Sequence, residues 1–215
     1  MRDTAPPRAH QFEDAGQQFD ASVFGMWIFL VTEVLFFGGL FAAYAVYRWS
    51  YPEAFKAASH TLDINLGFLN TMVLIASSLT MAMAVHASQL SKKKALLVWL
   101  GLTILLGTAF LGVKAVEYSH KFQHHLVPGV HFSFPEYTGH GSQLFFSLYF
   151  AMTGLHALHM IIGIGLLLAL VVMAARGTFD ENYHNPVEIT GLYWHFVDIV
   201  WIFLFPLLYL IGRHG

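Results

Sequence analysis

The sequence predicts an all-α fold, an integral membrane bundle of five transmembrane helices. Composition is the first reason: 56% of the 215 residues are hydrophobic and only 11% are charged, whereas about a quarter of an average soluble domain is charged. The second reason is that five separate segments are apolar over about 20 residues, the length that a helix needs to cross a bilayer. The third is that these segments contain almost no Asp, Glu, Lys or Arg.

The residue counts also exclude several kinds of site. The chain has no cysteine, so it can form neither disulfides nor thiolate-bound metal centres. A net charge of −2 without a basic stripe gives no reason to expect a nucleic-acid partner. No phosphate loop, nucleophile elbow or zinc-protease motif is present. Thirteen histidines keep the question of haem or metal binding open.

The chain divides into a tail and a membrane domain. Residues 1–22 are polar and of mixed charge, and they lack the apolar core of a signal peptide; we expect this tail to be flexible until it meets a partner. Residues 23–215 form the five-helix transmembrane domain. Its predicted spans are about 23–48, 66–88, 95–118, 145–175 and 189–211. The fourth is long for one crossing and should tilt, and Pro206 should kink the last only slightly.

Lysine and arginine predict the orientation of the chain. With five spans, the N-terminal side carries six of these residues, and the other side carries four, or five if Lys114 reaches the interface. The excess includes the Lys92-Lys93-Lys94 cluster in a short loop. Because cytoplasmic loops are enriched in Lys and Arg, we expect the N-terminus in the cytoplasm and the C-terminus outside.

The first span contains one charged side chain, Glu33. It lies ten residues beyond Val23, about 15 Å along a helix and close to the bilayer centre. An ionised, unpaired carboxylate there costs at least ~2.5 kcal/mol. Glu33 is therefore expected to be neutral, paired, or turned toward a protein or water-filled interior.

Four other polar residues are expected at a similar depth. His195 and Asp198 lie three residues apart on one face of the fifth span, and His156 and His159 fall near the middle of the fourth. With Glu33 they could form one mid-membrane polar cluster. The cluster could be a proton-accessible or regulatory site, or a hydrogen-bond set that fixes helix packing; spacing alone favours neither.

Two further groups of histidines allow metal chemistry, and one group of aromatic residues allows a binding surface. A b-type haem needs two histidines on different helices, which His86, His156, His159 and His195 could supply, although no spacing among them demands it. The histidines in and beside the loop after the third span could bind zinc or copper, but its prolines and glycines favour an exposed connector; they are His120, His124, His125, His131 and His140. The aromatic excess could form a quinone or lipid surface or pack against other subunits.

Five stretches resemble, in the right order, a family of membrane subunits. They are Trp27–Tyr44 around Glu33, Leu69–Thr71 with Ser77–Thr80, Glu117-Tyr118, Thr153–His159 with Ile161–Gly163, and His184 and Glu188 followed by Tyr193–Trp201. Together they resemble subunit III of the haem–copper terminal oxidases, cytochrome c oxidase above all.

The resemblance implies a non-catalytic subunit without catalytic residues or metal ligands of its own. Haems and copper would reside in the partner subunits I and II, while subunit III would stabilise subunit I, support proton uptake and bind membrane phospholipid. Glu33 matches the family's buried, carbodiimide-reactive carboxylate. His184 and Glu188 match a region near lipid head groups. The implied orientation agrees with the lysine count.

The chain departs from the longer members of this family, which have two more helices before the acidic one; it looks like the five-helix bacterial form. A partner subunit could carry the two missing helices. Whether lipid binds in a cleft is therefore not determined by the sequence. We expect a proton-pumping terminal oxidase of the bacterial cytoplasmic membrane, fed by cytochrome c or quinol. The rivals are a haem-b membrane cytochrome and a subunit III-like component of a nitric oxide reductase or quinol oxidase.

Overall fold

The computed structural model describes residues 11–129, 132, 134, 140–179 and 183–210. These residues form six α-helices and one π-helical turn. In chain order they are α1 (Ala15–Ser50), α2 (Pro52–His60), α3 (Ile64–Gln89), α4 (Lys93–Gln123), α5 (His140–Arg176), α6 (Asn185–Phe205) and η1 (Pro206–Leu210). The all-α prediction is confirmed for the described part of the chain.

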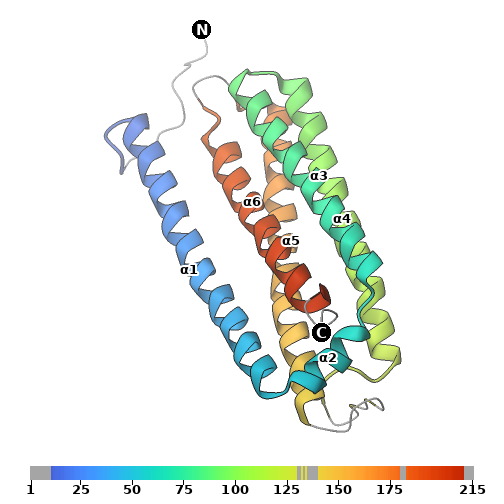
Figure 1. Ribbon diagram of the computed structural model, residues 1–215. Coiled ribbons are helices and arrows are strands. Elements are labelled where there is room, and N and C mark those ends of the chain that lie inside the picture. The colour runs from blue at the N-terminus through green and yellow to red at the C-terminus, as the bar shows by residue number, and fades with distance from the viewer. Residues whose placement is uncertain (1–10, 130–131, 133, 135–139, 180–182, 211–215) are drawn as a thin grey trace.

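The long helices run side by side as an elongated bundle with α6 in the middle (Figure 1). Helix α6 contacts α1, α3 and α5, whereas α1 contacts only α2, α5 and α6 to any extent. Helices α3 and α4 form a closely packed pair along the opposite edge from α1 (Figure 1). The first helix is thus the least enclosed one, and α6 is the helix around which the others pack.

Five of the helices are long and apolar enough to cross a membrane, as predicted: α1, α3, α4, α5 and α6 continued by η1. Helix α1 begins earlier than the predicted span, at Ala15 rather than residue 23. The carboxylate of Asp14 accepts a hydrogen bond from the backbone N–H of Gln17 at 2.7 Å and caps this start. The predicted boundary between tail and membrane domain, at residue 22, therefore falls inside α1. Residues 1–10 lie outside the described residues.

Helix α2 was not predicted, because it is short and only partly apolar. It begins with a proline, a residue favoured at the first helical position, and its buried Phe55 packs edge-on against Phe145 of α5 with ring centroids 5.4 Å apart. This short helix covers the end of the bundle between α1 and α3.

Three helices end in the same way, with a residue in the left-handed conformation. Ser91 (φ 51°), His125 (φ 55°) and Gly177 (φ 74°) follow α3, α4 and α5 respectively. After α3, the N–H of Lys92 donates to the carbonyl of Ala87 at 2.9 Å, and equivalent bonds close the other two ends. These are Schellman motifs, which normally place glycine at the left-handed position. Only the motif after α5 has glycine there; the other two have Ser91 and His125.

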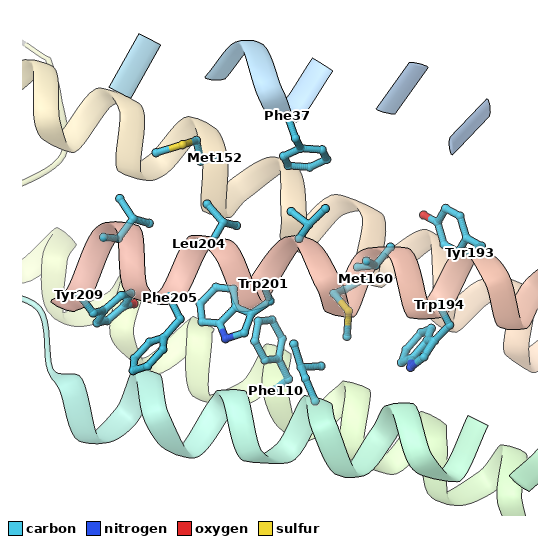
Figure 2. Close-up of a cluster of buried hydrophobic side chains, with 14 of the residues drawn as sticks. Phe37, Phe110, Met152, Met160, Tyr193, Trp194, Trp201, Leu204, Phe205 and Tyr209 are labelled. Carbon is cyan, nitrogen blue, oxygen red and sulfur yellow. The ribbon is translucent and has the colours of Figure 1, made fainter. Parts of the chain in front are cut away.

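The core is built around the indole rings of α6 (Figure 2). Trp194 is fully buried between glycines of two neighbouring helices. A Cβ atom at Gly107 of α4 would lie 2.8 Å from the Trp194 ring, and one at Gly163 of α5 would lie 2.9 Å from it. Only glycine lets these helices approach the indole so closely, so the two glycines set the distance between α4, α5 and α6.

Polar contacts inside the bundle tie α6 to α3. The Trp194 indole N–H donates to the Ser77 hydroxyl at 3.0 Å, and the Trp201 N–H donates to Thr71 at 3.1 Å. Large aliphatic side chains face outward instead, among them Leu35 and Leu105. Hydrogen-bonded polar groups inside and apolar side chains outside are what a bilayer requires of a helical bundle.

Candidate functional site

Glu33 on α1 pairs with His159 on α5. The Glu33 carboxylate lies 3.3 Å from Nε2 of His159, and the two side chains are 19% and 13% exposed. This contact joins the least enclosed helix to the body of the bundle at mid-span. Glu33 is thus paired, one of the three arrangements that its depth allows.

The other ring nitrogen of His159 determines the proton count of the pair. Its Nδ1 lies 2.9 Å from the carbonyl oxygen of Leu155, and because a carbonyl only accepts, Nδ1 carries a proton. In the neutral ring Nε2 then has only a lone pair, which would repel an ionised carboxylate. A favourable contact therefore needs one further proton, on Glu33 or on Nε2.

Aromatic rings enclose this pair. Phe37 of α1 meets the His159 ring edge-on at a centroid distance of 5.5 Å, and Tyr193 of α6 stacks near the same ring at 6.4 Å. The Tyr193 hydroxyl donates to the His159 backbone carbonyl at 2.9 Å. The rings hold the imidazole in one orientation and keep the contact in apolar surroundings.

The predicted polar cluster is divided between two faces of α6. His195 does not reach Glu33: its Nδ1 pairs instead with the Ser78 hydroxyl of α3 at 2.7 Å. Asp198 lies beside Ser78 and His195 along the same groove. Glu33 and His159 meet on the α1 side, whereas His195 and Asp198 face α3.

His156 lies in the core between these two groups. Its Nε2 donates to the carbonyl of Val197 at 3.1 Å, and its ring packs against Phe110 and Trp201 with centroid distances of 5.3 and 5.2 Å. A fully buried imidazole in this setting fixes the packing of α5 against α6. His156 thus takes part in helix packing and is not in contact with either polar pair.

The pair proposed for lipid head groups sits at the start of α6. His184 Nε2 lies 3.3 Å from the Glu188 carboxylate, and the side-chain amide of Gln89 at the end of α3 donates to the same carboxylate at 2.6 Å. Both His184 and Glu188 are about one-quarter exposed. Their groups therefore connect α3 and α6 while remaining partly exposed.

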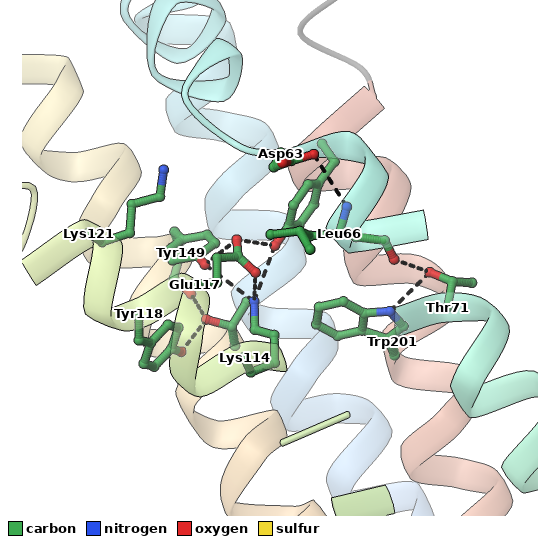
Figure 3. A network of polar contacts seen from close by, with 12 residues as sticks. Asp63, Leu66, Thr71, Lys114, Glu117, Tyr118, Lys121, Tyr149 and Trp201 are labelled. Carbon is green, nitrogen blue, oxygen red and sulfur yellow. Dashed lines mark hydrogen bonds and ion pairs between the residues drawn. The ribbon is translucent and has the colours of Figure 1, made fainter. Parts of the chain in front are cut away.

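A buried ion pair that the sequence did not indicate lies toward the other end of the bundle (Figure 3). Lys114 and Glu117 of α4 contact each other at 2.9 Å, and both are almost fully buried. The Glu117 carboxylate also accepts hydrogen bonds from Tyr149 of α5 at 2.8 Å and from Tyr209 of η1 at 2.5 Å. The Lys114 ammonium lies 5.0 Å from the centre of the Trp201 ring.

Lys114 therefore points into the bundle, so it is not the fifth lysine or arginine that the orientation count allowed on the outer side. The spacing of Lys114 and Glu117, three residues apart on one helical face, was the available signal. Without the tertiary structure, the tyrosines that complete the network could not be assigned to it. Lys121, one further turn along α4, is also buried and donates to the backbone carbonyl of Thr61 at 2.6 Å.

Within the described residues, no group of three or more His, Asp or Glu side chains is placed to hold a metal ion. His131 of the histidine-rich loop lies outside these residues, and so does the side chain of His140. His156, His159 and His195 have the separate partners given above.

Comparison with known proteins places the chain in a family. The sequence model of "Cytochrome c oxidase subunit III" matches residues 17–213. Cytochrome c oxidase subunit 3 of Alkalihalophilus pseudofirmus is 31% identical over 89% of this chain and 87% of that protein. Cytochrome bo(3) ubiquinol oxidase subunit 3 of Pseudomonas aeruginosa is 32% identical over 94% and 91%. A probable quinol oxidase subunit 3 of Staphylococcus saprophyticus is 29% identical over 95% and 96%.

These matches extend over all five long helices and include the Glu33 and His159 positions. The chain therefore belongs to the cytochrome c oxidase subunit III family, the accessory membrane subunits of haem–copper terminal oxidases.

Proposed function

We propose that this chain is the subunit III of a bacterial terminal oxidase that reduces oxygen to water and pumps protons across the cytoplasmic membrane. Haems and copper belong to subunits I and II in this proposal, and the chain itself contributes no redox centre. Relatives named for cytochrome c and relatives named for quinol match about equally well. The electron donor in this proposal is therefore either cytochrome c or quinol. The rival assignment, to a quinol oxidase, is kept beside that to a cytochrome c oxidase.

The Glu33–His159 contact is the observation that carries the role of this subunit. It holds one proton at mid-membrane depth, and Glu33 keeps about one-fifth of its side chain accessible. Helix α1, which carries it, has the smallest share of buried residues among the five spans. We infer that the pair supports proton uptake by subunit I and stabilises the contact with that subunit.

The test compares two substitutions on α1 in the intact oxidase. Glu33→Gln removes the exchangeable proton and keeps the shape of the side chain. Thr32→Val is the matched control, because the Thr32 hydroxyl only donates to the carbonyl of Phe29 in its own helix. Oxygen consumption is followed until the activity decays, with protons released per electron measured in vesicles. We expect Glu33→Gln to slow turnover or shorten the working life, and Thr32→Val to change neither.

Unchanged assembly, turnover, lifetime and proton stoichiometry in Glu33→Gln would contradict the role of the pair. Failure of this chain to co-purify with any haem-containing subunit would contradict the wider proposal. The identity of the co-purifying subunits also separates an oxidase from a nitric oxide reductase.

His184 and Glu188 are proposed as phospholipid head-group contacts at the cytoplasmic surface. Their side chains are partly exposed, and the imidazole has an N–H group that can donate to a phosphate oxygen. Native mass spectrometry of the complex measures the lipid that remains bound. We expect His184→Ala to lose bound phospholipid; equal lipid retention in His184→Ala and the unaltered complex would oppose the assignment.

The proposed function and the haem-binding alternative predict different results for replacement of His156. Because its Nε2 is engaged with the carbonyl of Val197 and its ring is packed between Phe110 and Trp201, we expect His156→Ala to leave the haem content of the complex unchanged. A reduced-minus-oxidised visible spectrum measures that content. Loss of one b-type haem per complex in this variant would make the chain an electron carrier.

A further inference from the structure

A groove of about 480 Å³ lies on the membrane-facing side of the bundle, between α3 and α6. Six of its nine lining residues are aliphatic, among them Leu79, which is 64% exposed, and Ile202, which is 45% exposed. The other three are Ser78, His195 and Asp198. The groove is thus an apolar surface, open toward the bilayer, with a polar strip along its floor.

The polar strip contains groups without a partner in the described part of the chain. Asp198 is 3% exposed, and neither of its carboxyl oxygens has a hydrogen-bond partner among the described residues. The Ser78 hydroxyl lies near enough to interact with Asp198, but its close contact, at 2.7 Å, is with Nδ1 of His195. Within the same residues, no hydrogen bond to Nε2 of His195 is formed.

Buried carboxyl groups without a partner are rare in folded proteins because they forgo the hydrogen bonds that water would give. In either protonation state the Asp198 carboxyl keeps at least one oxygen that only accepts. Apart from the Ser78 hydroxyl, which is in close contact with His195, no described residue offers it a donor. A donor from outside this chain would satisfy it.

The depth of Asp198 limits what can supply that donor. It follows Glu188 by ten residues, which places it about 15 Å into the bilayer, near the middle of a hydrocarbon core of about 30 Å. Acyl chains have no donors, and lipid head groups lie at the surface. A side chain on a membrane-spanning helix can deliver a hydroxyl, amide or cationic group to this depth.

The outer face of α6 beside Asp198 is apolar. Ile199, Ile202 and Phe203 form the outer face of α6 at a spacing of three and four residues, and all three are about half exposed. Helix α6 lies between α1 and α3 (Figure 1), and both flanking helices contact it. An apolar face of this kind on a membrane-spanning helix is a surface against which a second helix can pack.

We propose that a transmembrane helix of another oxidase subunit lies along α6 in this groove and donates a hydrogen bond to Asp198. The inference rests on the proposed function, because it assumes that the chain is assembled with oxidase subunits. It adds the surface that makes the contact and the chemistry of the partner segment, an apolar helix with one polar donor at mid-membrane depth.

Photo-crosslinking in the intact oxidase tests the location. A photoreactive phenylalanine analogue replaces Ile202, and the complex is irradiated in native membranes. The expected product joins this chain to another oxidase subunit, and mass spectrometry maps the adduct to a transmembrane segment that carries a side-chain donor. Adducts only with lipid or quinone, or with a second copy of this chain, would overturn the proposal.

Dissociation tests the hydrogen bond itself. Asp198→Leu keeps the groove filled but removes the acceptor, and we expect this chain to leave the detergent-solubilised complex about tenfold faster, the scale of one lost hydrogen bond. Thr108→Val on α4 is the control, because that hydroxyl only donates to carbonyls of its own helix. Equal dissociation rates in Asp198→Leu and the unaltered complex would refute the role of Asp198.

The outcomes separate this inference from the proposed function. If the chain co-purifies with haem-containing subunits but residue 202 reacts only with lipid, the groove assignment fails and the function stands. If no oxidase subunit co-purifies, both fail. If Asp198→Leu does not fold, the crosslink made with the native Asp198 in place decides the question.

Discussion

The Lys114–Glu117 pair makes the sharpest prediction about stability. Replacing Glu117 with Gln keeps an acceptor for the hydroxyls of Tyr149 and Tyr209 but leaves the Lys114 ammonium without its counter-charge. Removing one partner of a buried ion pair costs about 3–5 kcal/mol, because the remaining charge stays buried. Lys114 keeps a contact of 3.2 Å with the Tyr209 hydroxyl and its position near the Trp201 ring, so we expect the lower end of this range, about 3 kcal/mol.

That loss corresponds to a fall in Tm of about 6–12 °C for a chain of this length. The assay heats the purified complex in detergent and measures the temperature at which half of this chain has left the soluble fraction. Lys114→Met should cost a similar amount, because it leaves the Glu117 carboxylate buried with only the two tyrosine donors.

The double variant decides whether the two residues act as a pair. Combining Lys114→Met with Glu117→Gln removes both charges at nearly constant volume, which is often close to neutral for a buried pair. We therefore expect the double variant to recover at least ~2 kcal/mol relative to the sum of the single changes. Strictly additive losses, or single losses below about 1 kcal/mol, would refute a coupled buried pair.

Three smaller predictions concern packing and helix ends, all measured by the same thermal assay. Gly107→Ala should cost about 1–3 kcal/mol, because its Cβ would lie 2.8 Å from the Trp194 ring; Gly101→Ala, on the same helix with nothing within 4 Å, should be neutral or slightly stabilising, and equal effects would oppose the close-packing argument. Ser77→Ala should cost about 1–3 kcal/mol by leaving the Trp194 indole N–H unsatisfied, and no loss would indicate another acceptor. Ser91→Gly should stabilise by about 1 kcal/mol, because the residue at this helix end has φ 51°, and a lower Tm would contradict a conformational cost there.

The start of helix α1 and the short helix α2 illustrate the limits of prediction from the apolar pattern. The pattern located a membrane span but gave no signal for the polar turns from Ala15 onward, which are helical because Asp14 caps them. Capping is a local hydrogen bond and does not depend on apolar composition. Helix α2 was not predicted for a related reason: its formation depends on packing against α5, which the apolar pattern does not show.

The candidate site shows a different limit. The sequence indicated which side chains lie at mid-membrane depth, because depth follows from a fixed rise per residue. It could not indicate which of them meet, since that depends on how each helix is rotated about its axis and on which helices are neighbours. Glu33 therefore pairs with His159 rather than with His195 or Asp198, and Lys114 turns inward to Glu117.

The sequence by itself thus determined the all-α membrane class, the five spans and, through its motifs, the subunit III family. These properties depend on composition and on order along the chain, which folding does not change. The tertiary structure alone decided which polar groups are paired and which face outward, as Asp198 does without a partner among the described residues. Pairing depends on helix rotation and close packing, and here the packing of the Trp194 ring against Gly107 and Gly163 sets both.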